Sequence, residues 1–203
     1  MWSPRRDTHE GRPYNQEVKM VTTMPATRTM PIAPARVVLP MPDLAERLTG
    51  DAVAQARQKI ALGRRNDDLK TLLGVPAFIN AFVHALGCGV AEALAENDRF
   101  VQAAYIYDPS LNADSESGDE LPASGTVHLL VKIAKPSAAL EAFIASLDQA
   151  LAARLRELPS NKFAQRTSVL DVNLLTEEDV QRGAGYAAML SSVFAPPIKI
   201  WQR

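Results

Sequence analysis

Three β-like runs constrain this chain more than any other feature of its sequence. They cover residues 100–107, 126–134 and 168–175, and each is bounded by polar or turn-forming residues. Between the last two runs, leucine and isoleucine recur at helical spacing, which predicts a long helix over 137–158. A crossover of this length predicts that the second and third strands pair in parallel, with a right-handed connection.

Two helices are expected before the first strand. The first covers 43–62, with Asp43 as its N-cap and an apolar stripe of leucine, alanine and isoleucine. The second covers 76–97 and begins at Pro76, because proline is well tolerated at a first helical position. It is apolar on nearly all sides, which indicates burial on several faces.

The C-terminal quarter adds one short helix and one short strand. Thr176 is expected to cap the helix, with Asp179 completing a capping box, and glycines at 183 and 185 interrupt it. The run 198–201 follows two prolines and is expected to form an edge strand. The predicted fold is α/β (α+β), a small mixed sheet of three or four strands flanked by helices, in the order α-α-β-β-α-β-α-β.

Residues 1–42 differ in composition from the rest of the chain. They hold seven of the 14 prolines, and six Lys/Arg against three Asp/Glu. Proline removes backbone donors and restricts the preceding residue, so this segment is expected to be an extended or disordered arm. The remainder, 43–203, is expected to be a single α/β domain. The apolar part of the arm, 20–41, is a candidate surface for a protein partner or for a second subunit.

Composition excludes several classes of protein. The formal net charge of −1 does not indicate a nucleic-acid or membrane partner. The basic residues of the arm are scattered and have few aromatic residues near them in the sequence, so nucleic-acid binding is not indicated there either. A bilayer-spanning helix over 75–95 would have to bury Asn80, His84 and Glu92, so a core helix is the better interpretation. One cysteine, Cys88, and no apolar leader indicate a cytoplasmic protein.

The loop after the first strand is long and acidic. It carries five acids, of which Asp114, Glu116 and Asp119 are the candidate metal ligands. A calcium loop is disfavoured, because Ala113 stands where an EF-hand needs glycine and Asp119 stands where a bidentate glutamate belongs. A solvated acidic loop is the preferred interpretation.

Over residues 76–180 the order of elements resembles the minimal nucleotidyltransferase fold of the DNA polymerase β-like superfamily. In that family a Gly-Ser turn after the first strand holds the nucleotide phosphates, and Asp-x-Asp on the next strand binds two metal ions. Here Asp108-Pro109-Ser110 replaces the Gly-Ser turn, and Thr126-Val127-His128 stands in place of Asp-x-Asp. Asp171 on the third strand is the one carboxylate near a matching position.

The resemblance assigns roles to a few residues. Ser110 and Thr126 occupy the nucleotide-binding positions, and Asp171 with His128 would be the catalytic candidates. Two-metal phosphoryl transfer needs clustered carboxylates, and threonine and histidine do not replace them for Mg²⁺. A His128–Asp171 pair on neighbouring strands could act as a base with its orienting carboxylate, or could bind one metal ion. The alternative is that the two are ordinary polar residues on a half-exposed face of the sheet.

Two functions from different classes follow. The favoured one is a non-catalytic nucleotidyltransferase-like module without a cofactor, which acts through protein contacts or self-association. The alternative is an enzyme that binds Mg²⁺ and a nucleoside triphosphate through carboxylates displaced into the acidic loop.

Overall fold

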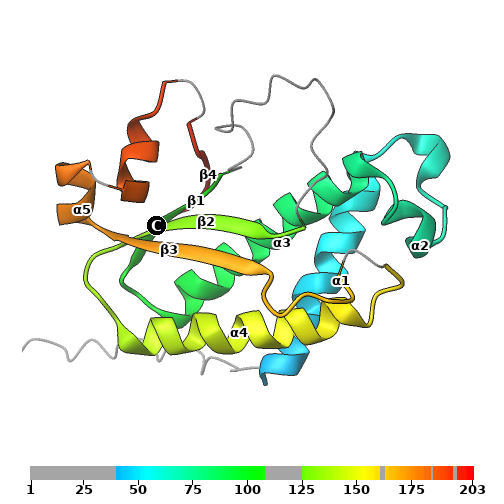
Figure 1. Cartoon of the computed structure of the whole chain (residues 1–203), viewed down its shortest axis with the longest axis horizontal. Helices are drawn as coiled ribbons and strands as arrows, with labels where there is room; N and C mark the ends of the chain where they lie inside the picture. The colour runs from blue at the N-terminus through cyan, green and yellow to red at the C-terminus, as the bar shows by residue number, and fades with distance from the viewer. Residues whose placement is uncertain (1–39, 108–124, 161–162, 184, 194–195) are drawn as a thin grey trace, which may run out of the picture. The chain divides into compact units, whose positions relative to one another are not determined.

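The computed structural model describes residues 40–107, 125–160, 163–183, 185–193 and 196–203. Their fold is mixed α/β, as the sequence predicts (Figure 1). The elements follow one another as α1 Met41–Lys59, η1 Leu62–Arg64, α2 Leu69–Leu72, α3 Pro76–Asn97, β1 Val101–Ile106, β2 Val127–Ile133, α4 Ala138–Arg156, β3 Leu170–Thr176, α5 Glu177–Arg182, η3 Gly185–Ser191 and β4 Ile198–Gln202.

The strands of the described residues form one four-stranded sheet in the order β3-β2-β1-β4. β2 and β3 pair in parallel through the α4 crossover, which confirms the predicted pairing. β1 pairs antiparallel with both β2 and β4. The C-terminal run therefore forms an edge strand, as its sequence predicts, and β3 forms the opposite edge.

The core lies between the sheet and the helices on one of its faces. In Figure 1, α3 and α4 lie on one side of the sheet, and α5 and η3 lie on the other. Val127, Leu129 and Val131 of β2 are fully buried in this core, together with Phe78 and Phe82 of α3. The alternation of apolar side chains along β2 therefore predicts the face that the helices cover.

α3 packs closely against both of its neighbours because its glycines leave room. A Cβ on Gly87 would lie 3.0 Å from Ile106 Cδ1 and 3.2 Å from Val127 Cγ1 of the sheet. A Cβ on Gly89 would lie 2.9 Å from Leu48 Cδ2 of α1. By length and composition alone α3 could also span a membrane, but 56% of its apolar stretch is buried within the fold.

A smaller apolar cluster lies on the second face of the sheet. It consists of Tyr107, Leu130, Leu175 and Ala187, with partly buried side chains of η3 and α5 packed around it. α5 has the predicted capping box of Thr176 and Asp179, and it ends at Gly183, whose φ of 62° is left-handed. The predicted interruption at this glycine is therefore confirmed.

Several predicted boundaries are wrong by a few residues. α1 begins at Met41 with Pro40 as N-cap, and Asp43 lies in its first turn and does not cap it. Proline in that turn needs no hydrogen-bond partner for a backbone N–H, so Pro42 does not delay the helix. The polar stretch after α1 contains η1 and α2, which were not predicted. Residues 1–39 and 108–124 lie outside the described residues, so the arm and the acidic loop stay predictions.

Candidate functional site

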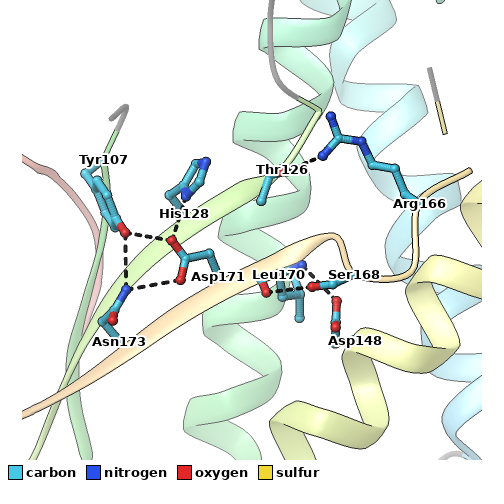
Figure 2. Close-up of polar contacts among 9 residues, drawn as sticks. All are labelled: Tyr107, Thr126, His128, Asp148, Arg166, Ser168, Leu170, Asp171 and Asn173. Carbon is cyan, nitrogen blue, oxygen red and sulfur yellow. Dashed lines mark hydrogen bonds and ion pairs between the residues drawn. The ribbon is translucent and has the colours of Figure 1, made fainter. Parts of the chain in front are cut away.

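A polar cluster occupies the second face of the sheet, on three adjacent strands (Figure 2). It consists of Tyr107, just after β1, His128 of β2, and Asp171 and Asn173 of β3. His128 and Asp171 are register partners of the parallel β2–β3 ladder, so their side chains emerge side by side on one face. Tyr107 continues the β1–β2 pairing, since its N–H donates to the His128 carbonyl at 3.1 Å.

The Asp171 carboxylate is the centre of this cluster. Its Oδ2 lies 2.8 Å from His128 Nδ1 and accepts a hydrogen bond from the Tyr107 hydroxyl at 2.9 Å. Its Oδ1 accepts from Asn173 Nδ2 at 3.3 Å, and the same amide donates to the Tyr107 oxygen at 3.2 Å. Both carboxylate oxygens are therefore engaged by neighbouring side chains, and the carboxylate has a fixed orientation.

Burial and hydrogen bonding together set the ionisation of Asp171 and Tyr107. Burial alone would raise the pKa of Asp171, but hydrogen bonds from His128, Tyr107 and Asn173 outweigh it and hold that pKa below its usual value. Burial raises the pKa of Tyr107 far above its ordinary value, and the neighbouring Asp171 carboxylate adds to this effect. At neutral pH the site therefore contains an ionised carboxylate and a neutral phenol that donates to it.

The two ring nitrogens of His128 differ in their surroundings. When the ring is neutral, a proton on Nδ1 donates to the carboxylate and leaves the Nε2 lone pair available. Nε2 is buried and has no hydrogen-bond partner among the residues that the structure describes. The Tyr107 ring packs against the imidazole with 5.3 Å between centroids, and the Tyr186 ring lies 6.0 Å from that of Tyr107. Chemically, this Nε2 can act as an oriented hydrogen-bond acceptor or as one ligand of a metal ion.

The structure brings together only part of the set that the sequence suggests. His128 and Asp171 meet, as expected. Thr126 lies apart from them, and its hydroxyl accepts a hydrogen bond from Arg166 Nη1 at 2.6 Å (Figure 2). Ser110 and the acidic-loop residues lie outside the described residues. Their roles therefore stay predictions: metal binding for Asp114, Glu116 and Asp119, and nucleotide binding for Ser110.

Tyr107 and Asn173 complete the site and were not predicted as members of it. Asn173 shares a face with Asp171 by strand alternation, and this position was a usable signal. Tyr107 follows β1 directly and continues its pairing with β2, but its hydrogen-bond partner Asp171 lies two strands away in the sheet. Its hydroxyl reaches Asp171 only because β1 and β3 both flank β2.

The remaining metal-binding and nucleophilic residue types were searched in the part of the chain that the structure describes. In the described ranges, no three His, Cys, Asp or Glu side chains are grouped so as to hold a metal ion. Cys88 Sγ lies 3.8 Å from His84 Nδ1 on α3. Burial raises the pKa of the Cys88 thiol, so the group stays protonated at neutral pH and is a poor nucleophile.

Comparisons of the chain with protein-family models, with curated proteins and with solved structures found no match.

Proposed function

We propose that this chain is a non-catalytic α/β module with a nucleotidyltransferase-like order of elements, which acts through protein contacts or self-association. The observation that carries the proposal is the state of Asp171. Two-metal phosphoryl transfer needs carboxylate oxygens that are free to bind cations. Here the donors of His128, Tyr107 and Asn173 already point at both oxygens of this carboxylate.

Exposed apolar side chains support the second half of the proposal. Three of them lie close together in sequence near the C-terminus: Tyr186 is 47% exposed, Val193 87% and Ile198 60%. Each of these side chains is accessible to a protein partner. The apolar part of the arm, 20–41, is proposed as a further contact segment on the basis of its sequence.

The competing proposal is an enzyme that binds Mg²⁺ and a nucleoside triphosphate. Its metal would be held by Asp114, Glu116 or Asp119, with Asp171 as an additional carboxylate. It differs from the first proposal in one direct way, because only the enzyme should be stabilised by nucleotide in a metal-dependent manner.

Thermal unfolding of the full chain with ATP, CTP, GTP and UTP, each with and without Mg²⁺, tests the two proposals against each other. A bound nucleotide at about 100 times its dissociation constant would stabilise the fold by about 2.7 kcal/mol. We expect no metal-dependent shift, and we expect sedimentation velocity to show self-association or a stable complex. A Mg²⁺-dependent shift that disappears in Asp171→Asn would overturn the non-catalytic proposal.

A further inference from the structure

The two edges of the sheet differ in how they are protected against pairing with another strand. β4 follows Pro196 and Pro197, carries Lys199, and has a register shift where it passes Ala104 and Tyr105 of β1. Proline, lysine and bulges are the devices by which natural sheets block an edge. β3 has none of these features, and its seven register pairs with β2 run without a shift. Within the described part of the chain, the β3 edge is therefore the one without these protections.

The register shows which β3 backbone groups point outward. Val127 donates its N–H to the Val169 carbonyl at 2.8 Å, so the carbonyl of residue 169 points toward β2. Successive residues of a strand in a parallel ladder alternate in this direction. Asp171 and Asn173 therefore point their backbone groups at β2, whereas Val172 and Leu174 point theirs away from the sheet.

Side chains satisfy the outward groups at both ends of the strand. The Leu170 N–H donates to Asp148 Oδ1 of α4 at 2.8 Å, and Ser168 Oγ donates to the Leu170 carbonyl at 3.3 Å. At the other end, the Thr176 N–H donates to Asp179 Oδ2 at 2.8 Å. Along the described part of this edge, the outward groups of Val172 and Leu174 are the ones left without such a partner.

We propose that the β3 edge is an interface with a second copy of this chain, which pairs antiparallel about a twofold axis at Asn173. This inference rests on the proposed self-association and names its surface. Val172 of one copy would then lie opposite Leu174 of the other, and each outward N–H would meet an outward carbonyl. The two copies would form one continuous sheet through their β3 strands.

The chemistry of the edge favours a second copy over a longer foreign strand. The open ladder is short and is symmetric about Asn173, so a second copy satisfies all of its groups. A longer strand would gain no further ladder bonds, because Asp148 and Asp179 already occupy the ends. In the symmetric pairing, half-buried Val172 and Leu174 contact each other on the helix side of the sheet. Asp171 would face Leu175 of the second copy, so no two carboxylates oppose each other.

Sedimentation velocity of the full chain over a range of concentrations tests this interface. Val172→Pro removes the outward N–H without removing a bond of the β2–β3 ladder, and proline is tolerated at such edge positions. Val172→Thr keeps the N–H and the shape of the side chain and is the matched control. We expect wild type and Val172→Thr to dimerise alike, and Val172→Pro to raise the dissociation constant roughly tenfold or more. Circular dichroism confirms that each variant is folded.

Amide hydrogen exchange of the unmodified chain gives a second test that needs no variant. We expect the Val172 and Leu174 amides to gain protection as concentration rises, while the Asp171 and Asn173 amides are protected throughout. A folded Val172→Pro chain that still dimerises as tightly as wild type would overturn the β3 interface and leave the proposed function standing. The β3 interface would also be overturned if the chain stays monomeric at every concentration, or if it pairs its β3 edge with a different protein. The nucleotide titration decides the proposed function separately.

Discussion

Asp171 links the charge of the second sheet face to the stability of the fold. Because its folded-state pKa lies below the unfolded value, its ionised form stabilises the native state at pH values above the unfolded pKa. That contribution is lost as the pH falls through the folded-state pKa. The Asp171 side chain is 40% exposed, so solvent screening keeps the contribution small.

We expect Asp171→Asn to lower the free energy of unfolding by about 1 kcal/mol at neutral pH, because it weakens a charge-assisted hydrogen-bond network. The difference from wild type should stay constant above the unfolded-state pKa of an aspartate, about 4, and should shrink as the pH falls below it through the lower folded-state pKa of Asp171. Urea denaturation at several pH values measures this difference. Asp51→Asn, at an exposed position of α1, is the control. A difference that does not shrink at low pH would contradict the role given to Asp171.

The pairing of His128 with Asp171 and the shared face of Asn173 could be predicted from the sequence, whereas the contacts of Tyr107 and the surroundings of the His128 ring could not. Alternation along each strand fixes which face a side chain occupies, and a parallel crossover brings the two strands together. The Tyr107 contact depends on where β1 ends and on the direction of one aromatic ring. The surroundings of His128 Nε2 depend on packing around the ring, and no periodicity in the sequence reports that.

At the scale of elements, α3 is the helix whose packing is most sensitive to side-chain volume. Gly87 faces Ile106 and fully buried Val127, which is stiff because it is branched at Cβ. We expect Gly87→Ala to lower the free energy of unfolding by about 1–2 kcal/mol, because overpacking exceeds the gain in helix propensity. Chemical denaturation monitored by circular dichroism gives the value.

Gly50 on α1 provides the matched control for this substitution. A Cβ added at this position would meet no atom within 4 Å, so Gly50→Ala gains helix propensity without a steric cost. We expect Gly50→Ala to raise the free energy of unfolding by up to about 1 kcal/mol. Equal effects of the two substitutions would mean that α3 does not pack tightly on the sheet.

Strong local signals made most elements predictable, and weak ones account for the misses. α3 has the predicted bounds because Pro76 starts it and its apolar run continues without a break. α2 was missed because it is a single short turn, although Asp68 caps it by accepting from the Thr71 N–H at 2.8 Å. β3 begins two residues later than predicted, at Leu170, and the N–H of the preceding Val169 donates to Asp148 of α4. A contact this distant in sequence leaves no local pattern.

At the scale of the whole molecule, the proposals separate two kinds of contact. The β3 edge is defined by backbone groups that the fold leaves open, whereas the 20–41 segment is a proposal from composition alone. Since the two surfaces belong to different parts of the chain, their effects on association should be separable by changing one at a time.

Removal of residues 1–39 tests the contribution of the N-terminal segment. The cut leaves Pro40, whose carbonyl accepts from the Leu44 N–H at 3.0 Å, so the first turn of α1 keeps its N-cap. We expect the shortened chain to associate more weakly than the full chain in sedimentation velocity, by roughly tenfold for each 1.4 kcal/mol of contact energy lost. If the segment and the β3 edge act independently, Val172→Pro should raise the dissociation constants of the full chain and of the shortened chain by the same factor. An unchanged dissociation constant for the shortened chain would restrict self-association to the folded part, and the β3 edge would then have to account for all of it.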